Sequence, residues 1–149
     1  MNITGQQIIA RLVLDCSIKS ADVHIADADY FVPSREWVLE TFPDWYWKAL
    51  KAIGAPAEWV RNHDCDNYSD AYHALAQICN ARRDPKLEEG VSVGKIWYFV
   101  HADQKKAHAI NCAFIRSGSG SELIFIEPQS ASEITLASNE RATIWFARF

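Results

Sequence analysis

The stretch HAINCAFIRSGSGSELIFIE, residues 108–127, decides the fold. Its two arms are rich in apolar and β-branched residues, which favour strands. Between the arms lies Ser117-Gly-Ser-Gly-Ser121, a segment typical of a tight turn. We therefore predict a β-hairpin built from strands 107–115 and 122–127.

Helical patterns come before this hairpin. The longest expected helix runs from Asp64 to Arg83 and has an apolar stripe at helical spacing, ending at Asp84-Pro85. Further strands are expected at 95–101 and 142–149. Helices followed by an antiparallel sheet predict an α+β fold, with the 64–83 helix packed on the C-terminal sheet. The other expected helices are 4–14, 34–41 and 44–53.

Length and composition indicate one globular domain over residues 1–149, with 49% hydrophobic and 23% charged residues. The net charge of -4 argues against nucleic acid or an anionic membrane as partner. The first 15 residues do not resemble a signal peptide, and no apolar run approaches the roughly 20 residues of a membrane span. We therefore expect a cytoplasmic protein; its oligomeric state is open.

Cys65 differs from the other three cysteines because of its neighbours. Asp64-Cys65-Asp66 opens the longest helix, so Cys65 lies where unpaired N–H groups and the positive end of the helix dipole favour a thiolate. The flanking aspartates oppose this effect. A cationic partner is therefore needed to offset the negative charge of these aspartates.

His108 is the expected partner of Cys65. Pairing Arg116 with Ser121 in the hairpin places Glu127 diagonally beside His108 on one face, within reach of a hydrogen bond. A carboxylate there would fix the imidazole tautomer and stabilise the imidazolium. A slip of one residue would move Glu127 to the other face, and Gln129 or a more distant group would then have to orient the histidine.

The order of these residues resembles the papain-like cysteine peptidase superfamily: a helix-start cysteine, then a strand histidine, then an acidic strand end. The segments that carry the resemblance are Asp64-Cys65-Asp66-Asn67-Tyr68, His108-Ala109 and Phe125-Ile126-Glu127-Pro128-Gln129. They are similar to the catalytic domain of the fairy-ring mushroom agglutinin with its bacterial and phage relatives, and to bacterial transglutaminase-like cysteine peptidases. The resemblance implies a papain-like fold.

The resemblance also implies a hydrolase of the peptidase or amidase kind, acting on a peptide or protein through a Cys65–His108–Glu127 triad and a thioester. Asn62, Trp59 and Gln129 are candidates for contacts with the substrate or the oxyanion. Two alternatives stay open. One is a transglutaminase-type acyltransferase, and the other is a catalytically inactive binding or inhibitory module of a phage or bacterium.

No cofactor is required by this chemistry, but two metal sites can be considered. Asp64, Asp66 and Asp70 could hold calcium, although an EF-hand pattern is absent. His63, Cys65, His101 and His108 could converge on zinc, although none of them has the spacing of common zinc motifs.

Overall fold

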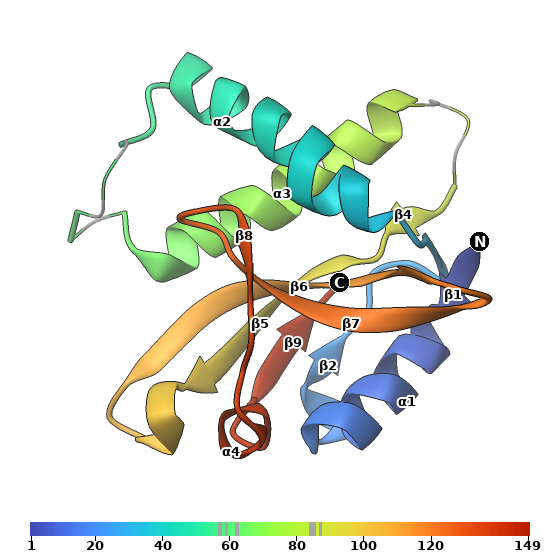
Figure 1. Cartoon of the computed structure of the whole chain (residues 1–149), viewed down its shortest axis with the longest axis vertical. Helices are drawn as coiled ribbons and strands as arrows, with labels where there is room; N and C mark the ends of the chain where they lie inside the picture. The colour runs from blue at the N-terminus through green and yellow to red at the C-terminus, as the bar shows by residue number, and fades with distance from the viewer. Residues whose placement is uncertain (57, 59, 62, 84–85, 87) are drawn as a thin grey trace.

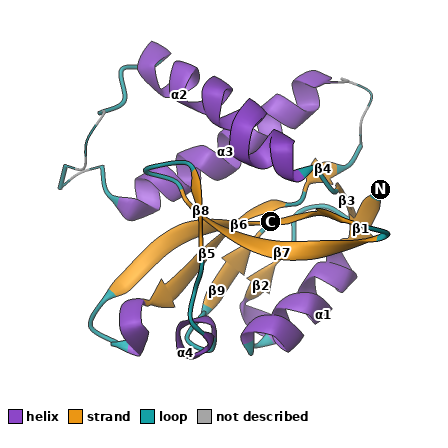
Figure 2. Cartoon of the chain, viewed as in Figure 1, coloured by secondary structure: helices purple, strands orange, loops and turns teal. Residues whose placement is uncertain are grey.

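The computed structural model describes residues 1–149 except 57, 59, 62, 84–85 and 87. A strongly twisted sheet forms the middle layer (Figure 1). Helices α2 and α3 cover one face of this sheet and α1 lies on the opposite face. Figure 2 shows the same layers by secondary structure.

The main sheet has six strands in the order β2-β9-β5-β6-β7-β8 among the described residues. Only the pairing of β2 with β9 is parallel. The last strand in sequence, β9, therefore lies between β2, near the start of the chain, and β5. The strands are β2 (Val23–His24), β5 (Val93–Phe99), β6 (Ala107–Ser117), β7 (Gly120–Glu127), β8 (Ser132–Ile134) and β9 (Phe146–Arg148).

The central hairpin has the predicted register. Arg116 of β6 pairs with Ser121 of β7, and Cys112 pairs with Phe125. The turn is tight, because Ser117 already pairs with Gly120 and Gly118 takes a positive φ of 56°. Glycine adopts this left-handed conformation without a steric penalty. The hairpin prediction is confirmed.

Two apolar clusters hold the helices on the sheet. On one face, α2 (Phe42–Ala52) and α3 (Cys65–Arg83) pack aromatic residues such as Tyr46 and Tyr72 against β6 and β7. On the other face, α1 (Gly5–Cys16) packs Ile8 and Leu12 against the strands. The Thr4 side chain caps α1 through a capping box.

The short strands of a second, smaller sheet were not predicted. Strands β1 (Asn2–Thr4) and β3 (Asp29–Phe31) pair antiparallel, and β3 pairs parallel with β4 (Gly90–Val91). The predicted order of helices first and sheet afterwards is therefore wrong. These strands have only two or three residues, too few to show an alternating pattern in the sequence.

Several boundaries also differ from the prediction. The 34–41 segment contains a π-helix at Trp37–Thr41 that runs into α2, so α2 begins at Phe42 rather than at the expected residue 44. The expected strand 142–149 is reduced to β9, since the short helix α4 (Ser138–Arg141) and a turn precede it. In the part of the chain that the structure describes, no helix combines the length and apolar character needed to cross a membrane.

Candidate functional site

Cys65 is the first residue of α3, and polar contacts fix this end of the helix on β6. The Ser69 hydroxyl donates to the carbonyl of Ile110 at 3.1 Å. In return, the side-chain amide of Asn111 donates to the carbonyl of Ser69 at 3.1 Å and to that of Gly94 at 3.0 Å. Ser69 and Asn111 are fully buried, so these bonds are shielded from water. They place Cys65 beside the beginning of β6.

His108 and Glu127 meet at the same end of the sheet. Nε2 of His108 lies 2.9 Å from Oε2 of Glu127, and the other carboxylate oxygen accepts from the backbone N–H of Gln129 at 3.2 Å. The side chains of His108 and Glu127 are each 22% exposed. Because Nε2 faces the carboxylate, Nδ1 is the nitrogen left for the thiol.

Cys65 and His108 are hydrogen-bond partners, and each shifts the pKa of the other. The hydrogen bond from His108 lowers the pKa of the Cys65 thiol, against the opposing effect of burial, and the backbone N–H of Ala109 assists. The bonds to Cys65 and then to Glu127 raise the pKa of His108 to about 9. The two shifts favour the charged form of both groups.

Two buried tyrosines, which sequence reasoning missed, complete the surroundings of this pair. The ring of Tyr98 lies 5.9 Å from that of His108, and burial raises the Tyr98 pKa to about 12, with contributions from Glu140, Glu127 and Cys65. Burial also raises the pKa of Tyr46, on which Tyr68 and Glu127 act as well. Tyr98 pairs directly with His108 across β5 and β6. No short turn joins these strands, so their register, and with it the position of Tyr98, could not be predicted from a sequence pattern.

Of the residues predicted to contact the substrate or the oxyanion, the structure describes only Gln129. Trp59 and Asn62 lie outside the described residues. Gln129 contacts Glu127 through its backbone and does not replace it as the partner of His108. The use of Trp59, Asn62 and Gln129 for substrate or oxyanion contacts stays a prediction.

The acidic residues considered for calcium have other partners. Asp70 forms an ion pair of 2.8 Å with the largely buried Lys95. A hydrogen bond with Asp64 raises the pKa of Asp66. Within the described residues, no three histidine, cysteine or acidic side chains come close enough to share a metal ion. Calcium stays a prediction.

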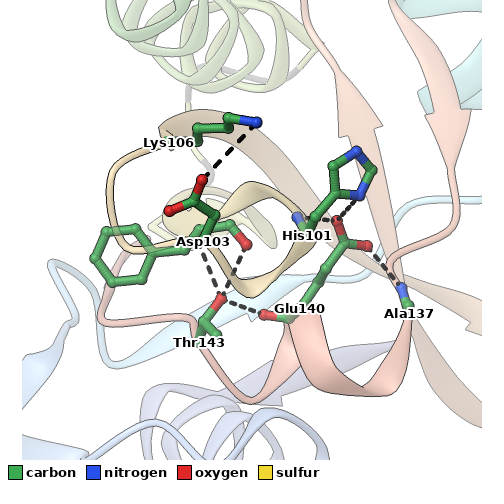
Figure 3. Close-up of polar contacts among 7 residues, drawn as sticks. His101, Asp103, Lys106, Ala137, Glu140 and Thr143 are labelled. Atoms are coloured by element: carbon green, nitrogen blue, oxygen red, sulfur yellow. Dashed lines mark hydrogen bonds and ion pairs between the residues drawn. The ribbon is translucent and has the colours of Figure 1, made fainter.

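The zinc alternative fails at His101. This residue lies in a 3-10 turn after β5, where its backbone N–H donates to Glu140 at 2.8 Å and its ring lies 3.7 Å from the same carboxylate. Figure 3 shows His101 directed toward Glu140 of α4. His108 instead uses its ring for Cys65 and Glu127, so the predicted set does not converge.

Several solved structures resemble this chain, among them these two. One is described as a PSL1a–E64 complex, with 19% identity and a TM-score of 0.72 over 99% of this chain and 51% of that one. The other is Polyporus squamosus lectin bound to the human-type influenza-binding epitope Neu5Aca2-6Galb1-4GlcNAc. It has 20% identity and a TM-score of 0.72, and the match covers 99% of this chain and 49% of the lectin chain. The chain thus spans about half the length of each. No family model and no curated protein matches the sequence.

These neighbours correct the predicted fold class and family. The fold is one found in a lectin, a finding that contradicts a helix-led papain-like fold and membership in the papain-like cysteine peptidase superfamily. The same finding contradicts the predicted resemblances to the catalytic domain of the fairy-ring mushroom agglutinin and to transglutaminase-like peptidases. Short shared motifs were the basis of that prediction, and such motifs can recur on different folds.

The predicted activity is corrected on the same finding. Lectins are binding proteins, which contradicts the expectation of an enzyme and of a cysteine hydrolase with a catalytic triad. The alternative of a binding module agrees better with these neighbours. The ligand named for Polyporus squamosus lectin is a glycan rather than the expected peptide. That nucleic acids and membranes are not partners stays a prediction.

Proposed function

We propose that this chain is a ligand-binding module in which Cys65, His108 and Glu127 form the ligand site. The thiolate of Cys65 captures an electrophilic ligand as a covalent adduct. The observation that carries this proposal is the position of Cys65 at the start of α3, with His108 as its partner and Glu127 2.9 Å from His108. This arrangement lowers the pKa of Cys65 and raises that of His108. An ordinary buried thiol has a raised pKa and reacts slowly.

The bond to Glu127 orients the imidazole of His108. It occupies Nε2, so Nδ1 is the nitrogen available to the sulfur. The backbone N–H of Ala109 adds a donor to the thiolate. The nucleophile is therefore held in place before a ligand arrives, which lowers the entropic cost of forming the adduct.

An epoxide such as E64, named with the PSL1a neighbour, is a suitable probe. The Cys65 thiolate attacks one ring carbon, so an S–C bond forms and the C–O bond of the epoxide breaks. The alkoxide takes the proton from the His108 imidazolium. The adduct therefore contains the whole probe, and no leaving group is released.

Intact-mass spectrometry with E64 near pH 7 tests this assignment. We expect one equivalent to add to the wild type and none to Cys65→Ser. Cys79→Ser is the matched control, because Cys79 lies on the same helix and has a thiol pKa raised by burial. Labelling that persists in Cys65→Ser, or that moves to Cys79, would refute the proposed site.

An activated ester separates capture from turnover. With p-nitrophenyl acetate, a binding module should release one equivalent of p-nitrophenolate as Cys65 is acylated, and then stop. Continued release that Cys65→Ser abolishes would overturn the binding-module proposal, because water would then be regenerating the thiol.

A further inference from the structure

Aromatic rings gather at one side of the main sheet, around β5 and β9. Trp145 lies 5.7 Å from Trp97, 6.3 Å from Phe99 and 6.4 Å from Phe146, measured between ring centroids. The ring of His24 lies 5.2 Å from that of Phe146. We call this group the aromatic surface; it consists of His24, Trp97, Phe99, Trp145 and Phe146.

The sheet directs these rings to one face. Residues two apart on a strand share a face, so Trp97 and Phe99 point the same way as Lys95, which meets Asp70 of α3. Trp97 pairs with Phe146 across β5 and β9, which places Phe146 on that face too. Trp145 is 45% exposed although its ring contacts three others, those of Trp97, Phe99 and Phe146.

Backbone and side-chain bonds hold Trp145 in this position. Its N–H donates to the carbonyl of Trp97 at 3.1 Å. The hydroxyl of Thr143, two residues earlier, accepts from the N–H of Phe99 at 3.0 Å and donates to the carbonyl of Glu140 at 2.7 Å. Figure 3 shows Thr143 tied to Glu140 in this network. The ring is therefore presented on a fixed backbone.

A hollow and a positive charge adjoin the aromatic surface. The hollow has a volume of about 420 Å³ and is lined by residues that include His24, Phe146 and Arg148. Arg148 is exposed and, among the described residues, has no carboxylate within ion-pair distance. Lys95, by contrast, is already engaged by Asp70. Arg148 is thus the cation available to a ligand.

We propose that the aromatic surface binds an oligosaccharide that carries a carboxylate. The flat, apolar faces of sugar rings stack on exposed tryptophan, and Trp145 and Trp97 offer two adjacent rings for this contact. The guanidinium of Arg148 matches the two oxygens of a carboxylate. The hollow lined by residues of β2 and β9 receives the part of the sugar that carries this group.

The charge balance argues against a nucleic acid on the same rings. Stacked bases bring one phosphate per nucleotide, and binding them requires several cations along the path. The chain carries a net charge of -4, and Arg148 is the cation that lines this hollow. A single carboxylate fits this charge better than a phosphate backbone.

This proposal does not rest on the thiol site. Its residues differ from Cys65, His108 and Glu127, and the test therefore includes Cys65→Ser. That variant should bind the saccharide as the wild type does, whether or not E64 labels Cys65.

Calorimetric titration with tetrasaccharides tests the proposal. The acidic probes are hyaluronan and oligogalacturonate tetrasaccharides, and the neutral match is chitotetraose. We expect an acidic probe to bind at least about 10-fold more tightly than chitotetraose. Trp145→Ala should weaken binding about 3- to 10-fold. Arg148→Gln should remove the preference for acidic probes.

Leu14→Ala is the control variant, because Leu14 is 79% exposed on α1 and should leave binding unchanged. The proposal is overturned if no acidic probe binds, or if Arg148→Gln keeps the preference. Tighter binding of a short oligodeoxythymidine would assign the surface to nucleic acid instead. Self-association that Trp145→Ala abolishes would assign it to a second copy of the chain.

Discussion

Two cysteines on one helix have opposite properties. Cys65 begins α3 and Cys79 lies about 21 Å further along its axis. His108 lowers the pKa of the Cys65 thiol, whereas burial raises that of Cys79 and Arg82 only partly offsets the rise. Both thiols are partly buried. Burial alone therefore does not decide which thiol ionises.

The difference comes from what each end of α3 meets. The first turn is bonded to β6, which supplies an imidazole and a backbone N–H to the sulfur. Cys79 lines a pocket with Trp37 and Trp45, where Arg82 acts on the thiol as a nearby charge and burial has the larger effect. A thiolate is stabilised by directed donors and a fixed cation more than by general exposure.

Removing the imidazole should have the largest effect on this comparison. In His108→Ala, we expect alkylation of Cys65 by iodoacetamide near pH 7 to slow about 100-fold, because the thiolate loses its cation. Peptide mass spectrometry after limiting alkylation would follow Cys65 and Cys79 separately. His101→Ala is the control, since His101 contacts Glu140 instead. An unchanged ratio of the two rates would show that His108 does not activate Cys65.

Removing the charge on Glu127 should have a smaller effect. In Glu127→Gln, the pKa of His108 should fall toward its usual range, and alkylation of Cys65 near pH 7 should slow about 10-fold. The His108 pKa can be followed by NMR titration of the ring protons. Glu133→Gln serves as the matched variant, because Glu133 instead forms an ion pair with Arg35 on the surface. An equal loss in both variants would contradict a specific role for Glu127.

Arg82 offers a way to sharpen the contrast from the other end of the helix. Arg82 lowers the pKa of Cys79, so Arg82→Gln should slow alkylation of Cys79 about 2-fold, as expected for an exposed charge. The rate at Cys65 should not change. Arg83→Gln is the neighbouring control. An equal decrease in the alkylation rate of Cys65 would mean that the charge of Arg82 acts along the whole helix.

The smallest expected effect concerns the free energy of unfolding, to which Cys65 and His108 together should give little pH dependence. The raised pKa of His108 gives stability that is full below pH 6.5 and is lost as the pH rises through about 9. The lowered pKa of Cys65 also stabilises the fold. This contribution is complete above the ordinary thiol pKa of 9.0, and it is lost as the pH falls through the lowered pKa of the folded protein. Between these limits the two slopes have opposite signs and offset each other.

Urea unfolding at pH 7.5 and 8.5 would measure this cancellation. The difference in unfolding free energy between the wild type and the double variant Cys65→Ser, His108→Ala should be the same at both values. A difference that grows in either direction would show that the two groups do not ionise as a pair.

The sequence predicted the parts of the fold that depend on local patterns. The glycine-rich turn at 117–121 set the register of β6 and β7, and the long apolar stripe located α3. The register brought His108 beside Glu127, as expected, although the role of these residues is a proposal. In each case the residues involved are close in sequence or share one periodic pattern.

The rest depends on contacts between distant segments. Tyr98 lies beside His108 only because β5 pairs with β6 across a turn that contains a 3-10 segment, and no pattern fixes that register. Asn111 reads as an ordinary strand residue, yet its amide joins α3 to β5. The predicted order of helices first and sheet afterwards was wrong because β1, β3 and β4 are too short to recognise in the sequence.

The position of β9 has a consequence for how the chain folds. Ala147 pairs with Val23 on one side and with Ile96 on the other, so the first and last parts of the sequence meet inside one sheet. Such contacts raise the contact order, which slows folding. During synthesis, the sheet cannot be completed before residues 146–148 leave the ribosome. Until then, β5 presents an open strand edge, the kind of surface that chaperones protect from aggregation.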